Sequence, residues 1–76
     1  MSKLLNQVYV IETKDGDFYE EEVEVYGSYE ATSKMLKVAQ NPYEAKSFLD
    51  FREADDIAYS YGFKVLALNT YLEEVN

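Results

Sequence analysis

The feature that most constrains this chain is an Asp15-Gly16 pair that lies between two β-rich runs. The first run covers residues 6–13, the second covers residues 18–26, and both are rich in Val and Tyr. Asp-Gly readily adopts the backbone angles of a tight hairpin turn. The pattern therefore predicts an antiparallel β-hairpin over these residues.

The segment 29–40 is compatible with two structures. Its apolar residues alternate with Lys37 as in a strand, but their spacing also suits a helix. We favour a strand over residues 33–39. Pro42 ends this strand because its ring restricts the residue before it, and Asn41 can cap a short helical turn there.

Residues 50–61 carry the clearest helical pattern. Asp50 can cap the first turn, and Gly62 can take the left-handed conformation that often ends a helix. Four apolar residues follow at i, i+3, i+4 and i+7 and form one stripe. These residues are Ala54, Ile57, Ala58 and Tyr61. The stripe is expected to pack on a sheet, whereas Tyr59 lies outside it.

Residues 63–72 are expected to form the last strand. Apolar residues occupy both of its faces, which is typical of an interior strand. The predicted fold class is therefore α+β: a small antiparallel or mixed β-sheet in the order β-β-β-α-β, with one helix packed on one face. We expect one α+β domain over residues 1–76, because a chain of this length has room for no more.

The composition argues against catalysis. The chain has no His and no Cys, so the commonest general base, the best nucleophile and any thiolate metal ligand are absent. A pair of carboxylates would need a cleft that separates their pKa values. The spacing of Asp15 and Asp17 does not match a calcium-binding loop. We expect no catalytic residues, no metal site and no cofactor.

The chain is strongly acidic. Fifteen Asp and Glu residues against seven Lys and Arg give a net charge of −8. Direct binding to nucleic acids or to anionic membranes is therefore disfavoured, whereas basic protein surfaces would attract the chain. We see neither a secretory signal nor an apolar run of the roughly 20 residues that span a bilayer. A cytoplasmic protein is expected.

Three carboxylates alternate along the second strand of the hairpin, at Glu20, Glu22 and Glu24. Residues i and i+2 of a strand share a face and stand about 6.7 Å apart, so the pattern predicts a row of negative charge on one face. Two hairpin registers are open. Glu20 faces Ile11 if Asp15-Gly16 forms a two-residue loop, and it faces Val10 if Gly16 sits in a bulge.

The row of carboxylates has two interpretations. Lys34 or Lys37 from a neighbouring strand would neutralise part of it, leaving a solvated face. Alternatively, the row forms a recognition surface for a basic groove, with Tyr19 and Tyr26 as aromatic anchors, because Tyr is enriched at protein interfaces. A second acidic group, which includes Asp55 and Asp56, surrounds the start of the expected helix. Capping and the helix dipole explain some of these charges without any partner.

Segments 41–48, 50–58 and 62–65 (NPYEAKSF, DFREADDIA and GFKV) carry a resemblance to known proteins. The chain resembles small accessory proteins of phages and mobile elements of Gram-positive bacteria, over roughly residues 34–66. The matched positions are packing, capping and turn residues, so the resemblance concerns the fold. It implies an inhibitor of host enzymes, such as an anti-CRISPR protein or a DNA-mimicking inhibitor of DNA repair.

Two functions follow as hypotheses. The first is a phage-type inhibitor that places an acidic, Tyr-bearing surface on a basic nucleic-acid-binding groove of a host enzyme. Its partner-binding residues would be Glu20, Glu22, Glu24, Tyr19, Tyr26, Asp55 and Asp56. The alternative is a small non-enzymatic structural or assembly protein that acts as a homodimer through exposed Tyr residues and apolar strand edges.

Overall fold

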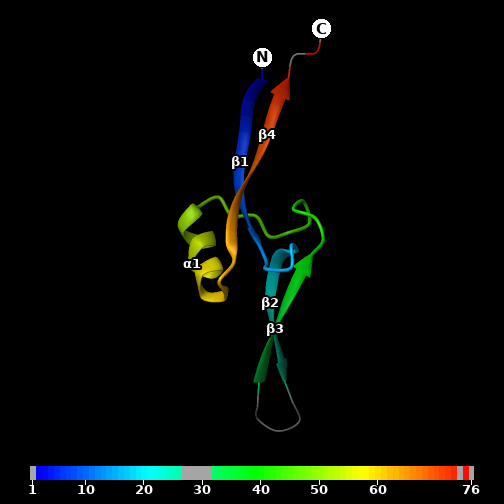
Figure 1. The fold of residues 1–76 in the computed structure, drawn as a ribbon, viewed down its shortest axis with the longest axis vertical. Coiled ribbons are helices and arrows are strands. Elements are labelled where there is room, and N and C mark those ends of the chain that lie inside the picture. The colour runs from blue at the N-terminus through cyan, green and yellow to red at the C-terminus, as the bar shows by residue number, and fades with distance from the viewer. Residues whose placement is uncertain (1, 27–31, 74, 76) are drawn as a thin grey trace.

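A computed structural model describes residues 2–26, 32–73 and 75, without the side chains of residues 2, 26, 32 and 33. It contains a four-stranded antiparallel sheet and one helix in the order β-β-β-α-β, which confirms the predicted fold class (Figure 1). The elements are β1 (Ser2–Glu12), β2 (Phe18–Tyr26), β3 (Thr32–Ala39), α1 (Phe51–Tyr61) and β4 (Lys64–Glu73). The strand favoured over residues 33–39 is confirmed as β3, and β1 begins earlier than predicted.

The hairpin turn connects β1 to β2, and these two strands pair at only one position. Gly16 has a positive φ of 86°, as a tight turn requires. Glu12 lies opposite Phe18, which agrees with the bulged register, but the pairing stops there. The prediction that Glu20 faces either Val10 or Ile11 is therefore wrong.

The segment at Phe48, and not β2, pairs with β1 at Tyr9. The Tyr9 N–H donates to the Phe48 carbonyl oxygen, and the Phe48 N–H donates to the Tyr9 carbonyl oxygen, both at 2.8 Å. These bonds satisfy the edge of β1 after β2 has turned away, as buried backbone groups require. Beyond the turn, β2 pairs with β3 along its length.

The strand order is β3-β2-β1-β4, so β4 lies at an edge of the sheet. The prediction of an interior last strand is wrong. Val65 on one face of β4 packs against the core. On the other face, Leu66 is 38 % exposed and Leu72 is 58 % exposed. Apolar residues on both faces therefore indicate a surface that the chain itself leaves open.

Helix α1 begins and ends at the predicted residues. The Asp50 carboxylate accepts a hydrogen bond of 3.0 Å from the Arg52 N–H, and Gly62 adopts the left-handed conformation with a φ of 73°. Ala54 and Ala58 are buried against the sheet, as the apolar stripe predicts. Within the described part of the chain, no helix has the length and hydrophobicity needed to cross a bilayer.

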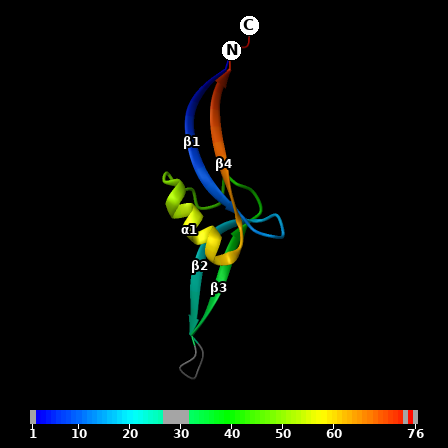
Figure 2. The same cartoon turned by 60° about the vertical axis from the view of Figure 1, so that its left-hand side comes forward.

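The core is small and lies at the middle of an elongated molecule. Its buried cluster consists of Ile11, Tyr19, Phe48, Ala54 and Ala58. The molecule measures 63 × 22 × 19 Å, and its radius of gyration is 15.9 Å, whereas about 11 Å is typical of a compact domain of this length. The β1–β4 ribbon and the β2–β3 ribbon project from the core in opposite directions (Figures 1 and 2). The ribbons therefore extend far beyond the core that stabilises them.

Candidate functional site

A β-bulge at Glu20 divides the predicted row of carboxylates. In the pairing of β2 with β3, Tyr19 lies opposite Val38 and Glu21 lies opposite Lys37, so Glu20 is the extra residue. One extra residue reverses the faces to which the following side chains point. Glu20 consequently lies near Lys37, and Glu22 lies on the opposite face of the ribbon.

The chain's own lysines neutralise part of this charge. The Lys37 Nζ lies 3.4 Å from a Glu20 carboxylate oxygen, and the Lys34 Nζ lies 3.2 Å from a Glu22 carboxylate oxygen. Lys34 and Lys37 are three residues apart on β3, so they point to opposite faces. Glu24 lies directly opposite Lys34. The prediction of one unbroken negative row is wrong, and the expected neutralisation by Lys34 and Lys37 is present at Glu22 and Glu20.

A hydrogen bond from the helix also engages Glu22. The Tyr61 hydroxyl donates to the Glu22 carboxylate, and this bond raises the pKa of Tyr61 to about 12, with burial adding to the effect. The same bond, together with Lys34, lowers the pKa of Glu22. No sequence signal joins residues 39 positions apart. The apolar stripe of α1 predicts that Tyr61 packs on the sheet, but not that it binds a carboxylate.

The substitution Glu22→Gln should lower the pKa of Tyr61 from about 12 toward its ordinary value of about 10. Because the folded-state pKa of Tyr61 is raised, its contribution to stability is fully present below pH 10 and is lost as the pH rises toward 12. The ultraviolet absorbance of tyrosinate, titrated in Glu22→Gln and compared with Tyr61→Phe, measures this shift. Glu21→Gln is the control, since Glu21 does not bind Tyr61. An unchanged Tyr61 titration in Glu22→Gln would contradict the assignment.

The two proposed aromatic anchors differ. Tyr19 is only 7 % exposed, and its ring lies 6.3 Å from the ring of Tyr61. Burial raises the pKa of Tyr19, and the charges of Glu22 and Glu21 raise it further. The prediction that Tyr19 is an exposed anchor is wrong, because its ring belongs to the buried core cluster. Tyr26 is the last residue of β2, and its side chain lies outside the described residues.

The acidic group on α1 is separate from the acidic strand. Asp55 and Asp56 are exposed, as is Glu53, and none of the three forms a salt bridge with a described residue. The helix packs on β1 and β4, and it reaches β2 through Tyr61, whose hydroxyl donates to the Glu22 carboxylate. Asp55 and Asp56 do not belong to the stripe of α1 that packs on the core, which consists of Ala54, Ile57, Ala58 and Tyr61.

The β1–β4 ribbon presents a surface that sequence analysis missed. Residues 4–11 and 65–72 contain no charged residue, although 29 % of the chain is charged. Near the free end of this ribbon, large apolar side chains are about half exposed, namely Leu4, Leu5, Tyr71 and Leu72. The sequence signal for this surface is the presence of two uncharged runs of equal length in a strongly charged chain. The structure shows that the two runs pair with each other.

A chain of side-chain hydrogen bonds crosses the same ribbon. The Tyr9 hydroxyl donates to the Gln7 Oε1 at 3.2 Å, and the Gln7 Nε2 donates to the Asn69 Oδ1 at 2.9 Å. The Asn69 Nδ2 then donates to the Tyr71 hydroxyl at 3.3 Å. These bonds link β1 to β4 with neutral groups alone. Hydrogen bonds between uncharged side chains therefore connect the two strands of the ribbon.

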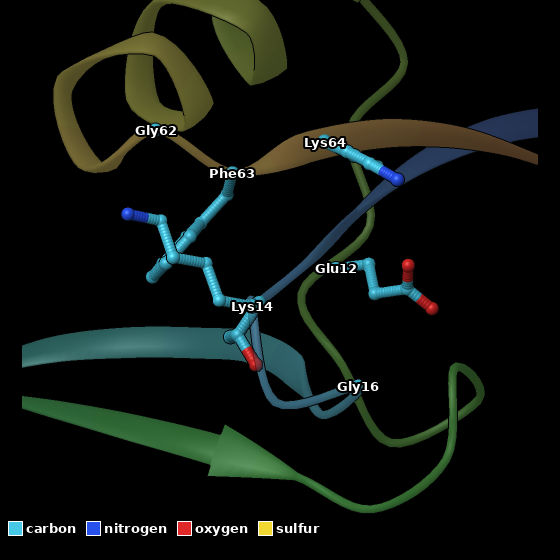
Figure 3. A pocket seen from close by; sticks show the side chains of 7 residues that line it. Glu12, Lys14, Gly16, Gly62, Phe63 and Lys64 are labelled. Atoms are coloured by element: carbon cyan, nitrogen blue, oxygen red, sulfur yellow. The ribbon is translucent and has the colours of Figure 1, made fainter.

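The described residues also form a shallow hollow beside the hairpin turn. Its volume is about 150 Å³, and it is lined by Glu12, Thr13, Lys14, Gly16, Gly62, Phe63 and Lys64 (Figure 3). Ligand clefts typically enclose roughly 300–1,000 Å³. The hollow contains one carboxylate, so it does not supply the pair needed for acid–base chemistry. Among the described residues, no group of three or more acidic side chains is placed to hold a metal ion.

Three candidate surfaces emerge from the described residues: the divided acidic strand, the outward side of α1, and the charge-free β1–β4 ribbon. Each offers a face for binding and none encloses a deep cleft. In comparisons with known proteins, no protein-family model, no curated protein and no solved structure matches this chain.

Proposed function

We propose that this chain is a non-enzymatic structural or assembly protein that acts as a homodimer. The observation that carries the proposal is the accessible surface of the chain, which is 6162 Å². A compact monomer of 8.8 kDa exposes about 4,800 Å². The excess of about 1,400 Å² is larger than the roughly 800 Å² that each partner buries in a standard protein interface.

The distribution of this surface supports self-association. An isolated two-stranded ribbon is marginally stable in water, because it has too few neighbours to bury its apolar side chains. The β1–β4 ribbon extends beyond the core with Leu4, Leu5 and Leu72 exposed. Covering these side chains stabilises the ribbon by about 25 cal/mol for each Å² of apolar surface removed from water.

A second copy of the chain suits this ribbon better than a charged partner does. The net charge of −8 makes two copies repel each other overall. The charge-free runs 4–11 and 65–72 are the place where two copies approach with least repulsion. Charged residues are also depleted at the centres of protein interfaces.

The test is the oligomeric state as a function of concentration and salt. Sedimentation equilibrium and light scattering should detect a dimer, and raising NaCl from about 0.05 to 0.5 M should strengthen it, because salt screens the repulsion between two acidic copies. A chain that stays monomeric up to millimolar concentration would refute the homodimer. A dimer that dissociates with added salt would show that attraction between charges holds it, and would contradict the charge-free ribbon as the reason for association.

A second candidate function is the phage-type inhibitor that binds a basic nucleic-acid-binding groove of a host enzyme. Its specific support is the exposed pair Asp55 and Asp56, which make no salt bridge with a described residue. The salt bridges at Glu20 and Glu22 reduce the charge that β2 can offer such a partner. Pull-down of host nucleases and repair enzymes tests this function. Binding should weaken as salt rises, which is opposite to the homodimer, and Asp55→Asn with Asp56→Asn should reduce it.

A further inference from the structure

We propose that two copies of this chain pair through the outer edges of β4, antiparallel about a two-fold axis near Leu68 and Asn69. The pairing joins the two β1–β4 ribbons into one sheet with the strand order β1-β4-β4-β1. This inference rests on the proposed homodimer and identifies its contact surface. An edge-to-edge contact of this kind is self-complementary, as a two-fold interface must be.

The backbone of β4 presents open hydrogen-bonding groups to a partner. Tyr9 lies opposite Ala67, and both backbone groups of Tyr9 bond to Phe48 on the far side of β1. Ala67 therefore directs its own N–H and C=O away from β1. Since these directions alternate along a strand, Val65 and Asn69 share this orientation. No described residue hydrogen-bonds any of these outward groups, and no other element lies beside the projecting half of β4 in either view (Figures 1 and 2).

The edge of β4 lacks the features that normally prevent strand pairing. Exposed edges are usually short or protected by charged residues, proline or a bulge. β4 is 10 residues long, and its residues 65–72 contain neither charge nor proline. The bulge in this ribbon lies on β1 and leaves β4 regular. The opposite edge of the sheet, β3, is protected by Lys34 and Lys37.

The side chains of β4 also suit pairing with a second copy. Leu66, Leu68 and Leu72 share the face that points away from α1, because they alternate with the core residue Val65. Antiparallel pairing about a two-fold axis keeps this face common to both copies. The three leucines of each copy then form one apolar stripe across the joined sheet. Cross-strand apolar pairs of this kind stabilise a sheet.

The charges at the ends of β4 are opposite in sign. The strand begins at Lys64 and ends at Glu73. In an antiparallel pair, the Lys64 end of each copy lies beside the Glu73 end of the other. The contact therefore places unlike charges at both ends and none in its centre, which favours this orientation over a parallel one.

The first test is Ala67→Pro. The Ala67 N–H points away from β1, so proline removes no hydrogen bond of the β1–β4 pairing, and proline is tolerated on edge strands in this position. It would remove one hydrogen bond from each copy across the proposed contact, so the dimer dissociation constant should rise about 100-fold. Circular dichroism checks that the variant folds. A folded Ala67→Pro variant that dimerises like the wild type would overturn the pairing.

The second test is disulfide cross-linking, which does not depend on proline being tolerated. The chain has no cysteine, so Leu68→Cys and Asn69→Cys each introduce a single thiol close to the two-fold axis. Residues directly opposite in an antiparallel pair have Cα atoms about 4.5–5.5 Å apart, which suits a disulfide. One of the two variants should cross-link rapidly under mild oxidation, and the faster one identifies the register. Val23→Cys, at an exposed strand residue on β2, is the control and should stay unlinked.

The outcomes separate this inference from the homodimer itself. A wild-type chain that is monomeric would refute both. A different outcome is that the wild type dimerises while Val23→Cys cross-links and neither Leu68→Cys nor Asn69→Cys does. That result would leave the homodimer in place and would move its contact surface to the β2–β3 ribbon.

Discussion

Replacing Phe48 with alanine should lower the free energy of unfolding by about 3–5 kcal/mol. Phe48 is 3 % exposed and belongs to the small cluster at the centre of the molecule. Removing its ring leaves a cavity where α1, β1 and β2 meet. A domain of this length has a total stability of roughly 4–11 kcal/mol, so the variant should lose at least about a quarter of its free energy of unfolding.

The neighbouring residue supplies the control for Phe48. Leu49 is 82 % exposed, so Leu49→Ala should change the free energy of unfolding by no more than about 0.5 kcal/mol. Urea denaturation followed by circular dichroism measures both variants. All chains are compared at one concentration, because the proposed dimerisation would add a concentration-dependent contribution. Equal effects of Phe48→Ala and Leu49→Ala would contradict the position of the core.

Replacing Ala58 with aspartate should cost at least about 3 kcal/mol at pH 7. Ala58 is 1 % exposed and faces the sheet from α1. The introduced carboxyl would lie among apolar side chains without a cationic partner. Burial raises the pKa of such a group, so the penalty should shrink as the pH falls to about 4, where the folded state holds the carboxyl neutral.

Tyr59 provides a matched control for the helix. It is the next residue of α1 and is 86 % exposed, so Tyr59→Asp adds the same carboxylate to water. Its effect should stay within about 0.5 kcal/mol and should not depend on pH between 4 and 7. Thermal denaturation at both pH values measures the two variants. A Tyr59→Asp penalty as large as that of Ala58→Asp would show that helix propensity, and not burial, causes the loss.

The candidate site was predicted less well than the fold. Glu20, Glu22 and Glu24 were correctly placed on a strand, and Lys34 and Lys37 were correctly named as neighbours that reduce their charge. The bulge at Glu20 was not predicted, because no local preference marks the residue at which a strand gains an extra member. This one residue decides which carboxylates share a face.

Interactions between near neighbours let the sequence alone determine the turn at Gly16, the strand β2, and the cap and end of α1 at Asp50 and Gly62. Backbone angles and capping bonds depend on residues a few positions apart, so they can be read along the chain. Only the tertiary structure decided that β4 is an open edge. Phe48 and β2 compete for the far side of β1, and that outcome depends on how distant segments pack. The same packing leaves the uncharged outer edge of β4 without a neighbouring strand in the sheet.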